Sequence, residues 1–261
     1  MPLRIAFDMD GVLADMEGEL VRQAETLFGR PMPRRAPDRD EASSTGATTG
    51  GGSPPGETPP DSPNPAQAAA ETSPDNVPPL LRMTMSSRQQ RKLWRHVESI
   101  ENFWLTLDET EPGIVARLAT IARERRWDVI FLTKRPESAG ATAQLQSQRW
   151  LESKGFSLPS LYVVQGSRGR IAAALGLDIV VDDRPENCLD VVVDSRARAI
   201  LVWRDDEKLL PGAARRLGIG VVKSVGECLD ILTKVDSKEQ ESAGVVDRVK
   251  RLLGLKETAR A

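Results

Sequence analysis

Acidic residues stand directly after short apolar runs at two well-separated places in this 261-residue chain. Asp8 and Asp10 follow the apolar run at residues 3–7, and Asp182 and Asp183 follow a later run. Because ligands of an open parallel sheet bind beyond the carboxyl ends of its strands, these side chains are expected to face one crevice. Four carboxylates in one crevice repel each other strongly unless a cation joins them. Mg²⁺ is a hard cation that also binds phosphate oxygens, so the pattern predicts a magnesium-dependent phosphoryl-transfer site.

A hydroxyl and two basic residues follow a third apolar run, at residues 129–132. Thr133 could hydrogen-bond phosphoryl oxygens, and Lys134 or Arg135 could offset negative charge. On its own, Thr133 would more often be a strand-end hydroxyl bonded to its own backbone. The functional interpretation depends on three such segments occurring together, each after its own apolar run.

Other metal chemistries fit the sequence less well. A calcium loop needs Gly at its sixth position, whereas Gly11 is the fourth residue counted from Asp8. The single histidine, His96, excludes histidine-rich metal centres and is not assigned to catalysis. The two cysteines are too few for a disulfide framework or a four-thiolate zinc site. Any catalysis is therefore expected to depend mainly on carboxylates.

Apolar runs alternate with amphipathic stretches, which is typical of an α/β protein. Nearly continuous apolar strands are buried on both faces, as in a parallel sheet between two layers of helices. The sequence therefore predicts a Rossmann-like, doubly wound parallel sheet with a small helical cap inserted after the first strand. Strands are expected at 3–7, 129–132, 161–164, 179–181 and 199–202, and helices at 16–28 (capped by Asp15), at 86–101 and from Pro112 onward.

Residues 36–79 have the composition of a flexible acidic insert. They hold ten Pro, five Gly and ten Ser or Thr, and Val77 is the only apolar residue larger than Ala. Too little apolar surface is present to offset the entropy lost on ordering the backbone. A tolerated loop insertion is the favoured interpretation, and a tether for an unknown partner is the alternative.

These patterns predict three parts of the chain. Residues 1–15 and 106–235 would form the catalytic core, and residues 16–105 the helical cap that contains the insert. Residues 236–261 would form a polar linker and an amphipathic helix. We expect that helix to pack on the core, and a homodimer contact is the alternative.

The charge balance limits the classes of partner. There are 36 Lys and Arg against 38 Asp and Glu, a net charge of −2, so no extended polynucleotide or anionic-membrane surface is expected. No apolar run reaches the length of a membrane span, and the amino terminus has no secretory pattern. We expect a soluble, cytoplasmic protein.

Three segments in order resemble the motifs of the haloacid dehalogenase-like (HAD) phosphatases: Asp8–Asp15 (DMDGVLAD), Phe131–Thr133 (FLT) and Val181–Pro185 (VDDRP). More narrowly, the chain is similar to the cytosolic 5'(3')-deoxyribonucleotidases, whose segment before the second motif resembles residues 102–107 (NFWLTL) and 111–113 (EPG). The resemblance covers residues 3–28 and 93–203.

The resemblance implies roles for the predicted site residues. Asp8 would be the nucleophile that forms an aspartyl-phosphate, and Asp10 the general acid and base. Mg²⁺ would be held by Asp8, by the main-chain carbonyl of Asp10 and by Asp183, with Asp182 ligating through water or orienting its neighbour. Thr133 would bind the phosphoryl oxygens.

The chain departs from the family at one position. The family places a lysine between the second and fourth motifs, whereas the corresponding region here, residues 166–170 (GSRGR), has none. Arginine can supply the charge, and we favour Arg170 over Arg168 from its place in the expected helix. The alternative is that Lys134 or Arg135 reaches into the site.

The resemblance also implies a substrate. Phe103 and Trp104 could stack on a base or pack on a sugar, and Met16 would line the same mouth. The predicted function is a magnesium-dependent 5'-nucleotidase acting on (deoxy)nucleoside monophosphates. The alternatives are a phosphatase for another small ester, such as a sugar phosphate, and a phosphatase-like binding protein of low turnover that uses the acidic insert.

Overall fold

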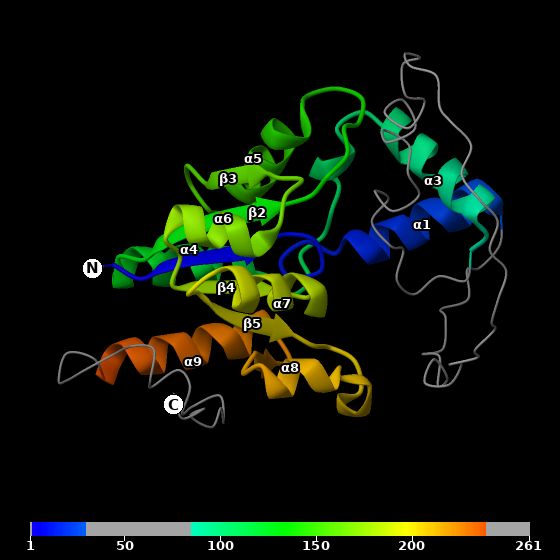
Figure 1. The fold of residues 1–261 in the computed structure, drawn as a ribbon. Coiled ribbons are helices and arrows are strands. Elements are labelled where there is room, and N and C mark those ends of the chain that lie inside the picture. Colours follow the sequence, from blue (N-terminus) through cyan, green and yellow to red (C-terminus); the bar gives the residue numbers. More distant parts are fainter. Residues whose placement is uncertain (1, 30–84, 239–261) are drawn as a thin grey trace, which may run out of the picture. The chain divides into compact units, whose positions relative to one another are not determined.

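A computed structural model describes residues 2–29 and 85–238 of the chain (Figure 1). Residues 1, 30–84 and 239–261 lie outside the described part. The insert expected at 36–79 and the helix expected near the carboxyl terminus, at 245–253, lie outside it. Both therefore stay predictions, and so do the predicted domain boundaries.

Six parallel strands form one sheet in the order β3-β2-β1-β4-β5-β6 (Figure 1). The first strand, β1, lies between β2 and β4, and its register pairs Asp8 with Leu132 and Phe7 with Val181. The carboxyl ends of these three strands therefore lie next to one another. The bounds are β1 Arg4–Asp8, β2 Asp128–Thr133, β3 Ser160–Val163, β4 Ile179–Asp182, β5 Arg198–Val202 and β6 Gly220–Val222.

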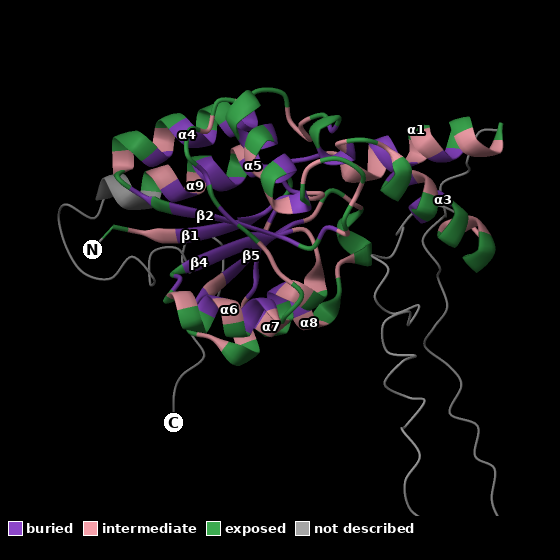
Figure 2. Ribbon diagram, turned by 90° about the horizontal axis from the view of Figure 1, so that it is seen from above, coloured by how far each residue is buried: buried purple, intermediate pink, exposed green. Residues whose placement is uncertain are grey.

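Helices cover both faces of this sheet. Figure 2 shows α4, α5 and α9 on one side and α6, α7 and α8 on the other. The prediction of a doubly wound α/β fold is confirmed. The bounds are α4 Ile114–Arg125, α5 Ala143–Ser153, α6 Arg168–Leu175, α7 Pro185–Asp194, η4 Glu207–Leu209, α8 Gly212–Arg216 and α9 Val225–Lys238.

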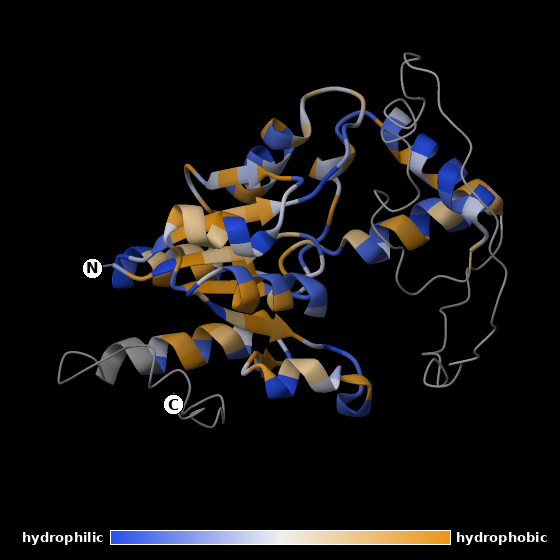
Figure 3. Ribbon diagram, viewed as in Figure 1, coloured by the Kyte–Doolittle hydropathy of each residue, from blue (hydrophilic) through white to orange (hydrophobic). Residues whose placement is uncertain are grey.

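The strands are buried on both faces because helices pack on each. The consecutive residues Ile5, Ala6 and Phe7 of β1 are all fully buried, and the central strands are hydrophobic along their length (Figure 3). On one face, Ala6 belongs to a core cluster that includes Ala172 of α6 and Val191 of α7. Full burial of a large apolar side chain contributes about 1.5–3 kcal/mol, so this packing fixes the sheet that carries the predicted site.

A helical insertion separates β1 from β2, as expected. It contains α1 (Met16–Phe28), α3 (Ser87–Ser99) and η3 (Phe103–Leu105). The predicted cap of the first helix is present, because Asp15 accepts a hydrogen bond from the backbone N–H of Gly18 at 2.9 Å. The second helix begins at a capping box that Ser86 and Gln89 form. Local capping thus sets where both helices begin.

Polar contacts join the two inserted helices. The Gln23 amide nitrogen donates to Glu19 at 2.7 Å within α1, and the Gln23 oxygen lies 3.1 Å from Nε2 of His96 on α3. His96 therefore has a structural partner, in agreement with its exclusion from the predicted catalytic residues.

The sequence interpretation missed the strand β6. Its three residues, Gly220–Val222, form an edge strand too short to stand out as an apolar run. In the ranges 2–29 and 85–238, every helix is too short or too polar to cross a bilayer.

Candidate active site

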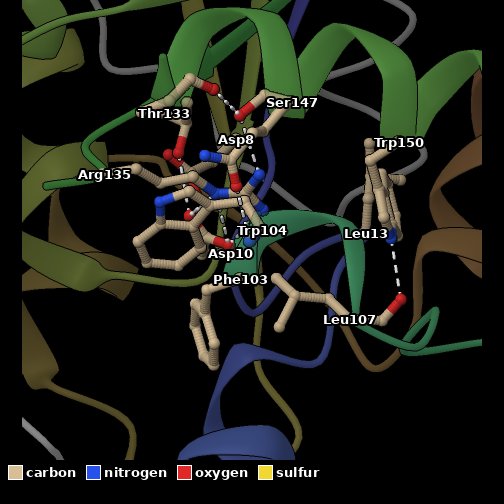
Figure 4. Close-up of polar contacts among 12 residues, drawn as sticks. Asp8, Asp10, Leu13, Phe103, Trp104, Leu107, Thr133, Arg135, Ser147 and Trp150 are labelled. Atoms are coloured by element: carbon tan, nitrogen blue, oxygen red, sulfur yellow. Dashed lines mark hydrogen bonds and ion pairs between the residues drawn. The ribbon is translucent and has the colours of Figure 1, made fainter. Parts of the chain in front are cut away.

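The carboxyl ends of β1, β2 and β4 bring the predicted catalytic segments together. Asp8 ends β1, Thr133 ends the neighbouring β2, and Asp182 ends β4 on the other side. Figure 4 shows Asp8, Asp10 and Thr133 close to one another. Asp8 thus shares one edge of the sheet with residues more than 100 positions away in the chain, as the strand order requires.

Asp8 is a buried carboxylate with a guanidinium partner. It is 7% exposed, and its Oδ1 accepts a hydrogen bond from Nη2 of Arg168 at 2.6 Å. Burial raises the pKa of Asp8 well above its usual value, the charge of Asp182 adds to this, and Arg168 opposes it. Arg168 is therefore the cation that offsets the charge of the predicted nucleophile.

Asp10 is held by a hydroxyl and by a second arginine. Its Oδ2 accepts a hydrogen bond from Oγ1 of Thr133 at 2.8 Å. Nη2 of Arg135 donates to its Oδ1 at 2.6 Å, and Nε of Arg135 contacts both oxygens (Figure 4). Thr133 thus lies beside the predicted acid–base residue, to which its hydroxyl donates, and its role in binding phosphoryl oxygens stays a prediction.

Asp182 and Asp183 differ in their surroundings. Asp182 is fully buried, and it accepts hydrogen bonds from the backbone N–H of Arg184 at 2.9 Å and from the Asn187 amide at 3.0 and 3.1 Å. Asp183, in contrast, has a buried Oδ1 without a hydrogen-bond partner. Burial, assisted by the charge of Asp182, raises the pKa of Asp183 to about 7. Of the two, Asp183 therefore has the unpartnered oxygen that a metal ligand needs, whereas Asp182 is bonded to the start of α7.

Magnesium fits the donor atoms at this edge. In the described ranges, no group of three or more His, Cys, Asp and Glu side chains is arranged to hold a metal. Mg²⁺ needs fewer protein ligands, because it keeps several waters and takes oxygens from one or two carboxylates and from phosphate. The unpartnered Oδ1 of Asp183 and the buried carboxylate of Asp8 are hard oxygen donors of this kind.

The structure favours Arg168 where the sequence favoured Arg170. The Arg170 side chain is 85% exposed and lies 3.9 Å from Asp194, whereas Arg168 reaches both Asp8 and, at 3.7 Å, Asp182. The reason is local. Ser167 caps α6 by accepting from the backbone N–H of Arg170, so Arg168 is the first helical residue and its side chain lies against the strand ends. The cap at Ser167 was the signal that could have identified Arg168.

The other predicted substrate-binding residues differ in their exposure to solvent. Lys134 is exposed and Met16 is half-buried. Phe103 and Trp104 are fully buried and pack edge to face, with ring centroids 4.9 Å apart. Neither aromatic ring is open to a ligand in this structure, because both residues are buried.

Arg204, which the sequence interpretation did not single out, holds the loop after β1 together with Glu111. Arg204 donates hydrogen bonds to the carbonyl oxygens of Gly11 and, at 3.3 Å, Val12. Nη2 of Arg204 also donates to Glu111 at 3.2 Å, and the Glu111 carboxylate accepts from the backbone at the start of α9, including the Val225 N–H at 2.7 Å. These hydrogen bonds connect the loop that carries Asp10 to the start of α9, the helix that follows the edge strand β6.

No family model matches this sequence, and no curated protein matches it either. Solved structures do. A provisionally named beta-phosphoglucomutase from Thermotoga maritima is 17% identical, with a TM-score of 0.45 over 89% of this chain and 99% of that one. A haloacid dehalogenase-like hydrolase from Streptococcus pneumoniae is 12% identical, with a TM-score of 0.43 over 88% and 97%. A HAD hydrolase of family IA from Entamoeba histolytica is 13% identical, with a TM-score of 0.43 over 96% and 100%. The sequence identities and TM-scores of these matches are low, so the matches assign no activity to this chain.

Proposed function

We propose that this chain is a Mg²⁺-dependent phosphomonoesterase of the HAD type that works through an aspartyl-phosphate on Asp8. The observation that carries the proposal is the place of Asp8, a buried carboxylate at the end of β1, 2.6 Å from the Arg168 guanidinium. Asp10 and Thr133 lie beside it, joined by a hydrogen bond of 2.8 Å. A nucleophile, an acid–base group, a hydroxyl and a cation thus meet at one edge of the sheet.

Two half-reactions use these residues. In the first, a carboxylate oxygen of Asp8 attacks phosphorus while the P–O bond to the leaving group breaks, and Asp10 gives its proton to the departing alkoxide. In the second, Asp10 takes a proton from a water that attacks phosphorus, and the bond from phosphorus to Asp8 breaks. Inorganic phosphate leaves and both side chains are restored. General acid–base catalysis of this kind contributes about 10²–10⁴-fold.

Arg168 and the metal balance charge in this scheme. Asp8 and Asp183 would hold Mg²⁺, together with the main-chain carbonyl of Asp10 that the sequence resemblance implies. When bound, the ion neutralises charge on the transferring phosphoryl group. Arg168 favours the ionised form of Asp8, against the effect of burial, and its planar, multiply donating head group suits phosphoryl oxygens.

We further propose (deoxy)nucleoside monophosphates as the substrates, on the basis of the resemblance of residues 102–107 and 111–113 to the nucleotidases. Because Phe103 and Trp104 are buried, base recognition would fall to other side chains. Sugar phosphates are the rival class. A panel of nucleotide and sugar phosphates, assayed for phosphate release with Mg²⁺ and after chelation, separates the two.

Replacing the nucleophile tests the reaction itself. Asp8→Asn keeps the shape of the side chain and removes its nucleophilic charge, so phosphate release should fall by at least about 10³-fold. Asp128→Asn is the matched control, since Asp128 is an exposed aspartate at the amino end of β2, and it should keep the wild-type rate. Undiminished hydrolysis by the Asp8→Asn protein would exclude the proposed nucleophile.

A further inference from the structure

We propose that Arg135 is a positioning residue that fixes the orientation of the Asp10 carboxylate, and that Ser147 and Trp104 hold Arg135 in place. The inference rests on the proposed function, because it concerns how Asp10 is kept ready for proton transfer. In this proposal Arg135 does not replace the family's lysine, and Trp104 does not stack on a substrate base.

The contacts between Arg135 and Asp10 leave the carboxylate little freedom. Nη2 of Arg135 donates to Oδ1 at 2.6 Å, while Nε lies 3.1 Å from Oδ1 and 2.9 Å from Oδ2. Thr133 donates to Oδ2 from another direction at 2.8 Å. Both oxygens are therefore engaged by groups from the end of β2, and rotation about χ2 of Asp10 would break several hydrogen bonds at once.

Arg135 is itself held on two sides. Its Nη1 donates to Oγ of Ser147 on α5 at 2.8 Å, and that hydroxyl donates to the Ala143 carbonyl oxygen at 2.7 Å (Figure 4). The Trp104 ring lies 4.8 Å from the guanidinium carbon, and Nε1 of Trp104 donates to the Pro136 carbonyl oxygen at 3.0 Å. The Arg135 side chain has no exposed surface, so it is already ordered before any ligand arrives.

The two arginines thus contact different aspartates. Arg168 contacts Asp8 and Asp182, whereas the carboxylate that Arg135 contacts is that of Asp10. Arg135 is therefore not the substitute for the missing lysine, which was one of the alternatives that the sequence left open.

Positioning accounts for this buried pair better than stability does. Taking a guanidinium and a carboxylate out of water costs about as much as their attraction returns, so a buried ion pair is weak evidence for stability. Proton transfer, in contrast, depends steeply on placement, since a misplacement of about 1 Å can cost about 10²-fold in rate. A rigid, two-pronged partner serves that requirement.

The experiment compares four full-length variants: Arg135→Met, Arg135→Lys, Ser147→Ala and, as a matched control, Arg117→Met. Arg117 pairs with Asp230 where α4 meets α9, outside the proposed site. Single-turnover cleavage is measured for the best alkyl phosphate of the substrate panel and for 4-nitrophenyl phosphate. The nitrophenolate leaves without a proton, so its ester depends less on a well-placed acid.

For Arg135→Met we expect cleavage of the alkyl ester to slow by about 10²-fold, that of the nitrophenyl ester by less than about 10-fold, and KM to change little. Arg135→Lys should restore at least part of the rate, since it keeps a cation but loses the two-pronged geometry. Ser147→Ala should give a smaller loss of the same kind, and it keeps the test decisive where Arg135→Met fails to fold. Arg117→Met should match the wild type.

A crystal structure of Arg135→Met or Ser147→Ala adds a readout besides activity: the Asp10 carboxylate should be turned or disordered relative to Thr133. The proposal is overturned if Arg135→Met and Ser147→Ala cleave the alkyl ester at the wild-type rate, if these two variants lose both esters equally, or if Asp10 is unmoved in them. A wild-type protein that hydrolyses no ester in the panel overturns the proposed function and this inference together, whereas an active wild type with insensitive variants overturns the inference alone.

Discussion

Gly11 and Asp183 lie so close together that a side chain at position 11 would have to displace the Asp183 carboxylate. A Cβ atom built on Gly11 would lie 2.0 Å from Oδ2 of Asp183, and the glycine has a φ of +85°. Both the backbone conformation and the carboxylate therefore require glycine here. The turn after β1 and the predicted metal ligand after β4 thus constrain each other.

Gly11→Ala should consequently impair the site. We expect Asp183 to be displaced, the apparent affinity for Mg²⁺ to fall by at least about tenfold, and the protein to lose about 1–3 kcal/mol of stability through backbone strain. Activity titrated with Mg²⁺ and chemical denaturation measure the two effects. Gly29→Ala is the control, because Gly29 also has a positive φ but would place its Cβ in open space. Equal Mg²⁺ dependence in both variants would contradict the link to Asp183.

Arg168 and Arg170 give a matched pair for the cation of the site. Arg168→Met leaves Asp8 and Asp182 buried without their counter-ion, so we expect a loss of about 3–5 kcal/mol in stability and strongly reduced activity. Arg168→Lys should recover part of both. Arg170→Met, at an exposed position, should change stability by less than about 0.5 kcal/mol. The reverse order of effects in denaturation and activity assays would restore Arg170 as the functional cation.

The raised pKa of Asp183 predicts a pH dependence of the metal-free protein. Its pKa is raised from 3.8 to about 7, chiefly by burial, so the folded state binds the proton more tightly than the unfolded state. The contribution of this group to stability is therefore fully present below about pH 4 and is lost as pH rises to about 7. In thermal melts with a chelator, Asp183→Asn should remove part of the fall in Tm across that window.

The stabilisation by Mg²⁺, measured as a rise in Tm in the same melts, should increase with pH. Because the ion must displace the proton from Asp183, added Mg²⁺ should raise the Tm of the wild type more at pH 8 than at pH 6. The Asp183→Asn protein should show little Mg²⁺ effect at either pH. A Mg²⁺-induced shift in Tm that is the same in both proteins would argue against Asp183 as a ligand.

The two cysteines should be unreactive in the folded protein. Both thiols are buried, and burial raises the pKa of Cys228 to about 12 and that of Cys188 well above its usual value. The nucleophilic thiolate is therefore scarce at pH 8. Iodoacetamide should label neither residue in buffer and both in guanidinium chloride, as mass spectrometry would show. Rapid labelling of Cys188 in the native state would reveal opening of the core beside Asp182.

Much of the fold follows from local patterns. The apolar runs of β1, β2 and β4 are continuous enough to mark buried parallel strands, and the parallel arrangement places their carboxyl ends at one edge of the sheet. The proximity of Asp8, Asp10 and Thr133 could therefore be predicted. The edge strand β6 could not, because three residues carry too little periodicity.

Only the tertiary structure determined which side chain contacts which partner in the site. The composition and order of the motifs determined that carboxylates, a hydroxyl and arginines would gather at one place. Whether Arg168 or Arg170 meets Asp8 depended on where α6 begins, and the burial of Trp104 against Arg135 depended on packing between segments about 30 residues apart. Such choices rest on side-chain direction and long-range packing, which spacing along a chain does not encode.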